Sequence, residues 1–389
     1  MTTSLFAYAF RPHFLLVGLG GLCLIPFWTF VYVNHSPLVG GLPPSLWHAH
    51  EMLFGLVNAA IAGFLLTSVA SWTGRKGFGG WPLIVMSALW VAARLLLASP
   101  VHGLAVAGVV VDLAFLPALA ALIAPPLLRE NNRNTPLLAV VALLWLCNVA
   151  FFWTVATGHL QLASRALVLT IDAIMILITV IGGRIVPAFT RTALRPAGRE
   201  GIVRSAPGLR VAAIGAMIVV TLSDLVMPDY RLTGVVAAIA AGIHAIRLSQ
   251  WGSLRTLRQP LVWVVHVAYA WLPVGLALKA FSLLADGPGN QYWVHALTVG
   301  TFSMMIMGVM TRTALGHTGR PMTAHPLTTV SYVLLLLAAV MRVFGPTVFG
   351  LRFNSAIVVS AVLWTGAFAL FLVIYLPILT RPRADGRPG

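Results

Sequence analysis

Residues 14–33 read FLLVGLGGLCLIPFWTFVYV, a run of 20 residues without a charged side chain. An α-helix that crosses the hydrocarbon core of a bilayer needs about 20 mostly apolar residues, so this run is long enough to span a membrane. It lacks a small-residue cleavage site, and we therefore expect a retained helix instead of a removed signal peptide.

The composition of the whole chain agrees with this expectation. Of 389 residues, 59% are hydrophobic and 9% are charged, whereas a soluble domain carries about 25% charged residues. So much apolar surface must face lipid. The net charge of +16 comes from basic residues scattered through short loops, which argues against a nucleic-acid partner.

Apolar stretches of spanning length recur along the chain, separated by Pro- and Gly-rich breaks. They predict an all-α integral membrane protein, a polytopic bundle that forms a single transmembrane domain over residues 1–389. The expected helices lie near 13–33, 46–70, 82–98, 103–123, 136–156, 160–187, 207–227, 232–250, 259–284, 292–314, 325–344 and 353–379.

The 25 Lys and Arg residues are distributed unevenly between alternate loops. Most of them fall on one side of the predicted bundle, and the Arg-rich stretch 188–206 is the largest group. Because cytoplasmic loops carry the excess of Lys and Arg, this bias predicts that both termini are cytoplasmic.

The most informative polar motif is Trp47-His48-Ala49-His50-Glu51, at the start of the second predicted helix. Successive residues of an α-helix are about 100° apart, so His48 and His50 point in different directions and cannot chelate one small metal ion. They can serve two neighbouring centres. The alternative is an interfacial aromatic belt with two solvated histidines.

The tenth predicted helix repeats part of this pattern. His50 is followed by Gly55, and His295 is followed by Gly300 at the same spacing. Both helices run inward from the outer face in the predicted topology, so the two imidazoles should lie at nearly the same depth. Two histidines so placed suit a six-coordinate haem, although glycine is common enough in membrane helices for the repeat to arise by chance.

Other polar residues fall inside predicted spans, where each charge costs at least about 2.5 kcal/mol unless it is compensated. We expect an ion pair between Arg94 and Asp112, which are separated by a short hairpin. Asp172 is also placed in mid-helix, and it belongs either to a polar path or to a structural ion pair. Glu51 could orient a ligating imidazole. His244 and His266 are either ligands or hydrogen-bonded core residues.

Several segments together resemble the NnrS family of bacterial inner-membrane proteins. The matching segments are Phe10-Arg11-Pro12, Trp47 to Gly55, 62–67 (AGFLLT), 72–75 (WTGR), 182–191 (GGRIVPAFTR), 295–300 (HALTVG) and 316–320 (GHTGR). They are spread over most of the chain. His13 stands where the family usually has an aromatic residue.

The resemblance implies a haem- and copper-containing protein of the bacterial inner membrane that protects against nitrosative stress, in connection with denitrification. It implies nitric oxide as the small-molecule ligand and b-type haem as a cofactor. His50 and His295 are then the expected haem ligands, and His48 the expected ligand of copper or of a second centre. The remaining expected site residues are His266 as a metal ligand, and Arg94 or Arg165 as partners of haem propionates.

Three functions remain open from the sequence. The first is nitric oxide binding or turnover; turnover would make the protein an oxidoreductase that draws on a quinol or a cytochrome. The second is a transporter, since buried Asp and Arg suit ion coupling. The third is a delivery protein for haem or copper. The sequence leaves open the functional roles of Asp112, Asp172, His244 and His317.

Overall fold

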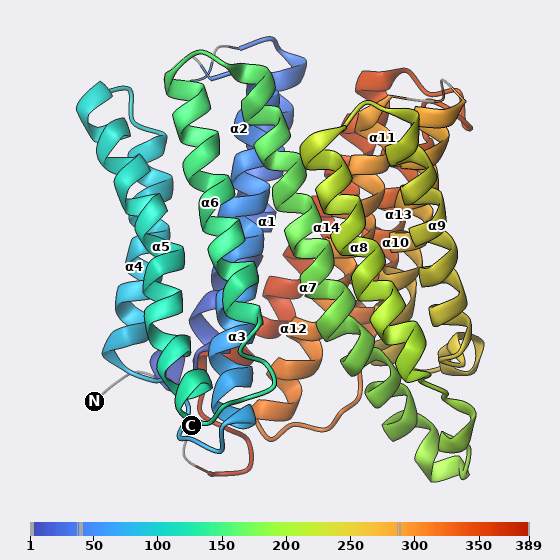
Figure 1. Cartoon of the computed structure of the whole chain (residues 1–389). Coiled ribbons are helices and arrows are strands. Elements are labelled where there is room, and N and C mark those ends of the chain that lie inside the picture. Colours follow the sequence, from blue (N-terminus) through green and yellow to red (C-terminus); the bar gives the residue numbers. More distant parts are fainter. Residues whose placement is uncertain (1–3, 37, 39–41, 286, 288, 388–389) are drawn as a thin grey trace. The chain divides into compact units, whose positions relative to one another are not determined.

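The computed structural model describes residues 4–36, 38, 42–285, 287 and 289–387 (Figure 1). Within these residues every regular element is a helix and there is no strand. Eleven helices of the described part are long and apolar enough to cross a membrane. The predicted polytopic helical membrane bundle is thereby confirmed, whereas the orientation of the termini stays a prediction.

The spanning helices include two composite ones, each interrupted by a π-helical segment. They are α1 (Phe10–Val33), α2 (Pro44–His50) with η2 (Glu51–Val57) and α3 (Asn58–Trp72), α5 (His102–Arg129), α6 (Leu137–Ala156), α7 (Leu160–Leu194), α8 (Pro207–Val226), α9 (Arg231–Ser249), α10 (Pro260–Leu284), α11 (Asn290–His295) with η6 (Ala296–Ser303) and α12 (Met304–His317), α13 (Pro326–Phe344) and α14 (Phe353–Thr380). The predicted helix 82–98 corresponds to α4 (Trp81–Leu97), which is apolar but has only 17 residues. Short 3₁₀ turns are η1 (Ser4–Phe6), η3 (Arg195–Ala197), η4 (Glu200–Ile202) and η5 (Ser253–Thr256).

Most predicted helix ends agree with the structure within three residues, but two were placed too early. Two helices were expected to end at residues 123 and 187, which lie just before or at prolines. Helix α5 continues past Pro125 and Pro126, and α7 continues past Pro187. A proline removes one backbone donor, which disturbs a helix. Membrane helices tolerate this because neighbouring groups satisfy the freed carbonyls.

Two π-helical segments directly follow the histidines that the sequence repeat singled out. Segment η2 begins right after His50, and η6 begins right after His295. A π-helix uses i→i+5 hydrogen bonds, is rare, and often lies at a functional site. The sequence repeat therefore corresponds to a repeated irregularity of the backbone.

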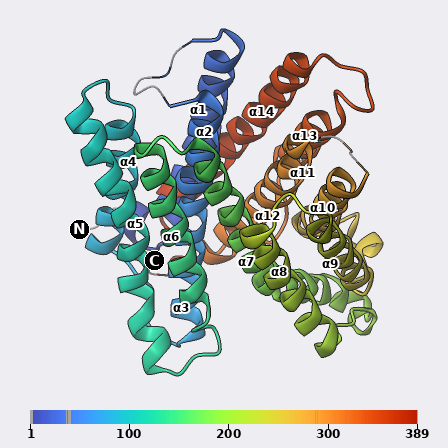
Figure 2. The same cartoon turned by 45° about the horizontal axis from the view of Figure 1, so that its top comes forward.

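The chain divides into two compact units, each built from discontinuous segments. The first unit contains residues 1–170, 312–322 and 368–389, and the second contains residues 171–311 and 323–367. In the first unit α5 packs against α4, α6 and α3 (Figure 2). In the second unit α9 packs against α8 and α10. Organisation as one transmembrane domain stays a prediction.

Polar and apolar side chains are arranged as expected for helices surrounded by lipid. Large apolar side chains such as Phe30, Leu95 and Trp153 are exposed on the helix surfaces, whereas Asp112 and Lys279 are buried. Polar groups inside a membrane bundle turn inward because lipid cannot compensate them. The interior of the units is therefore the place to look for a functional site.

Candidate functional site

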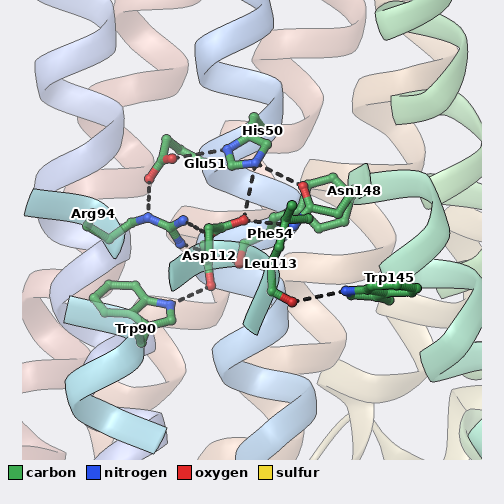
Figure 3. Close-up of polar contacts among 10 residues, drawn as sticks. His50, Glu51, Phe54, Trp90, Arg94, Asp112, Leu113, Trp145 and Asn148 are labelled. Atoms are coloured by element: carbon green, nitrogen blue, oxygen red, sulfur yellow. Dashed lines mark hydrogen bonds and ion pairs between the residues drawn. The ribbon is translucent and has the colours of Figure 1, made fainter. Parts of the chain in front are cut away.

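Five polar side chains from five helical elements meet inside the first unit (Figure 3). His50 ends α2, Glu51 begins η2, Arg94 comes from α4, Asp112 from α5 and Asn148 from α6. None of these side chains is more than 9% exposed. We call this group the His50 network.

Arg94 joins the two carboxylates of the network. Its Nε atom lies 2.9 Å from Glu51 Oε2, and its Nη2 atom forms an ion pair with Asp112 Oδ1. The guanidinium also lies over the Trp90 ring, 5.7 Å from the ring centroid. The predicted Arg94–Asp112 ion pair is confirmed, and it is part of a larger arrangement.

The contacts of the His50 ring define its protonation. Nδ1 lies 3.1 Å from Glu51 Oε1, and Nε2 lies 3.2 Å from Asn148 Oδ1 and 3.6 Å from Asp112 Oδ2. The Asn148 amide donates its Nδ2–H to Asp112 at 2.7 Å, so its oxygen is the atom that faces His50. Both ring nitrogens face oxygen atoms, and a doubly protonated His50 donates to both sides, so the contacts favour an imidazolium.

Charge balance supports this protonation state. The network holds two carboxylates, one guanidinium and one imidazolium, and these charges sum to zero. A buried charge without compensation is expensive in a membrane. Loss of the His50 proton would leave one net negative charge in the interior of the unit, so the network can hold a proton and can release it only when another charge changes.

The local backbone makes the network possible. His50 and Glu51 are consecutive residues, which diverge by about 100° in a regular helix, yet both side chains enter the same network. They sit where α2 gives way to the π-helical η2. A β-carbon at Gly55 would lie 3.0 Å from Arg94 Nη1, so the glycine leaves room for the guanidinium. The Gly55 carbonyl accepts a hydrogen bond from Trp90 Nε1 at 2.8 Å.

The expected haem ligands differ in how they fit iron. A histidine ligand needs one ring nitrogen for the metal, and the other commonly donates to a carbonyl or carboxylate. His295 Nδ1 lies against the Gln291 carbonyl, which fits this pattern. His50 does not fit in the observed arrangement, because both of its nitrogens are hydrogen-bonded. Its role as a haem ligand stays a prediction.

The other expected site residues lie outside the His50 network. His48 stacks on Trp28, with ring centroids 4.1 Å apart. Arg165 is exposed on α7. His266 is a hydrogen-bonded core residue of the second unit, with Nε2 2.7 Å from Thr190 Oγ1 and Nδ1 2.9 Å from Ser253 Oγ.

No group of three or more His, Cys, Asp or Glu side chains that could hold a metal ion occurs in the described part of the chain. Metal binding by His48 and by His266 stays a prediction, and so does the presence of copper.

Sequence reasoning missed Asn148, which fixes the donor role of His50 Nε2. A signal was present, because Asn148 is the single amide in the apolar α6 and is 1% exposed. A polar residue inside a span is costly and usually has a partner. The second missed residue, Trp90, gave no such signal.

The first and last motifs of the resemblance have a structural role. Arg11 donates to the backbone carbonyls of Leu379 and Arg381 at 2.9 and 2.7 Å, which holds the end of α14. The Phe10 ring packs on the His317 ring, with centroids 5.6 Å apart.

The segment after α14 continues this contact. Arg383 donates to the His317 carbonyl at 2.9 Å. Beside it, the Arg383 guanidinium lowers the pKa of the Asp385 carboxyl to about 2. His317 therefore belongs to the attachment of the C-terminal segment.

The family model described as "NnrS protein" matches residues 4–383. No curated protein matches the chain significantly.

Proposed function

The chain belongs to the NnrS family, because the family model covers nearly all of it, and from this membership we propose that it binds nitric oxide and protects against nitrosative stress. The family supports a general role of this membrane protein in the nitric oxide response. The proposal adds haem, of b type, and copper as cofactors, and the bacterial inner membrane as location.

The His50 network is the observation that carries the proposal. It buries a protonated histidine from the Trp47–Gly55 motif within a charge-balanced group of a lipid-facing helical unit. Nitric oxide is small, neutral and lipid-soluble, so it reaches such an interior without a polar channel. An imidazolium held there stores a proton that the network releases when another of its charges changes.

The residues of the proposal lie in two units and have separate tasks. His295, whose Nδ1 lies against a backbone carbonyl, would hold haem iron, and haem would supply the site that binds nitric oxide. In the first unit His50 holds a proton, Glu51 and Asn148 orient its ring, and Arg94 pairs with both carboxylates. Nitric oxide would bind at the haem, so the hydrogen bonds of the His50 network stay intact when it binds.

The test uses the full chain purified in detergent. Visible spectra of the oxidised, reduced and nitric oxide-treated protein are recorded together with metal analysis. We expect a Soret band that shifts with nitric oxide in the wild type and is lost in His295→Ala. His159→Ala, at the exposed turn before α7, is the control and keeps the band.

The same spectra decide the role of His50. If it ligates iron, His50→Ala loses or strongly alters the Soret band. If it holds a proton in the network, the band remains and the rate of nitric oxide binding changes. A folded, colourless and metal-free wild type contradicts the proposal, and rapid loss of metal to a chelator favours the delivery function.

A further inference from the structure

The second unit contains a buried ionic cluster that takes no part in the proposed function. Asp224 from α8 forms an ion pair with Lys279 from α10, and both side chains are 2% exposed. Asp172 from α7 is buried in the same unit and lies within electrostatic range of both groups. The Lys279 ammonium also lies over the Trp293 ring, 4.4 Å from its centroid.

The charges of this cluster do not balance if every group is ionised. Two carboxylates and one ammonium leave a net charge of −1, and both Asp224 and Lys279 act electrostatically on Asp172. An uncompensated buried carboxylate is unfavourable enough that the group takes up a proton instead. One proton is therefore shared among these groups.

The contacts indicate which carboxyl holds that proton. Lys279 pairs with Asp224, so Asp224 is the ionised partner. Two neighbouring carboxyl groups in a buried site disfavour the ionisation of both. Among the described residues Asp172 Oδ2 has no hydrogen-bond partner although Asp172 is 1% exposed. A buried oxygen without a hydrogen bond costs far less free energy in a neutral carboxylic acid than in a carboxylate.

We propose that Asp172, Asp224 and Lys279 form a proton-binding site in which Asp172 carries one exchangeable proton at neutral pH. Asp224 accepts the hydrogen bond of the Asp172 carboxyl, and Lys279 keeps Asp224 ionised. The ligand of the site is the proton itself. Trp293 covers the ammonium and lies two residues before His295 along the chain.

Infrared spectroscopy of the detergent-purified full chain at pH 7 tests this site. An ordinary Asp carboxyl, with a pKa near about 3.9, is ionised at that pH. We expect a carboxylic acid C=O band above the amide I region that moves to lower wavenumber in D₂O. The band is lost in Asp172→Asn, whose neutral amide replaces a neutral acid and preserves the fold.

Two further variants separate a shared proton from a simple ion pair. In Asp224→Asn the remaining carboxyl pairs with Lys279, so the band is lost as well. In Lys279→Met both carboxyls must be neutral, so the band grows. Asp229→Asn, at the exposed turn after α8, is the control and keeps the wild-type band.

The outcomes that overturn the proposal are equally distinct. A wild type without the band, a band that persists in a folded Asp172→Asn protein, or a band that does not shift in D₂O each contradict it. Haem content and nitric oxide spectra are independent of this result, so failure here leaves the proposed function standing.

Discussion

His50 Nδ1 lies 3.1 Å from Glu51 Oε1, so two residues that are neighbours in the sequence also hold each other inside the first unit. Because Glu51 contacts Arg94 as well, this contact links the histidine to a charge on another helix.

Arg94→Met should destabilise the protein strongly. The substitution leaves two buried carboxylates with one imidazolium, and breaking a buried ion pair by removing one partner costs about 3–5 kcal/mol. Thermal unfolding in detergent measures the change. Arg75→Met is the control, because the Arg75–Glu130 pair is 40% and 47% exposed and should contribute about 1 kcal/mol or less. Equal effects of the two variants would contradict the buried network.

Glu51→Gln should convert His50 to a neutral ring. With one carboxylate removed, Arg94 and Asp112 balance each other, and a protonated His50 would leave an excess positive charge in the interior. Nitrogen NMR of histidine-labelled protein distinguishes imidazolium from neutral imidazole. Glu130→Gln, which alters an exposed carboxylate, should leave the His50 signal unchanged. An imidazolium in both variants would remove the charge-balance argument.

Gly300→Ala should lower thermal stability more than Gly55→Ala. A β-carbon at Gly300 would lie 2.4 Å from the Trp271 ring, whereas one at Gly55 would lie 3.0 Å from the movable tip of Arg94. Overpacking of this kind costs typically about 1–3 kcal/mol. Gly215→Ala on α8 meets nothing within 4 Å and should stabilise slightly, because alanine favours helix. The melting temperatures should follow this order, and the reverse order would contradict the packing.

The predicted topology places Thr157 outside the cell and Ser205 in the cytoplasm. Both residues are exposed, so a cysteine at either position can react with a thiol reagent that does not cross membranes. In intact cells we expect labelling of Thr157→Cys only, and labelling of Ser205→Cys after permeabilisation. The background carries Cys23→Ser and Cys147→Ala. The opposite labelling pattern would reverse the orientation.

Hydropathy predicted the helices because lipid imposes a length and an apolar composition on every span. The Arg94–Asp112 ion pair could be predicted from the sequence because a short turn joins their two helices. The proline-based ends of α5 and α7 were wrong, since a helix inside a bundle continues past proline.

The contact of Glu51 with the His50 imidazole agrees with the expectation that Glu51 orients an imidazole. The contacts of Nε2 could not be predicted, because Asn148 is 98 residues away in the sequence and because residue spacing assumes a regular α-helix where the structure has a π-helical segment. Side-chain hydrogen bonding of this kind follows from packing, which sequence periodicity does not describe.

The π-helical segment η2 sets how the residues of α2 are aligned with those of α3 along the composite helix. Because π-helical bonds close over one residue more than α-helical bonds do, residues 51–57 accommodate an extra residue between α2 and α3. Deleting one residue there would let the helix run on as continuous α-helix, because the π-helical segment takes up its extra residue without turning α2 against α3. The composite helix would still span, while the local backbone that brings His50 and Glu51 into one network would be lost. A deletion of one residue thus separates the network from the architecture that carries it.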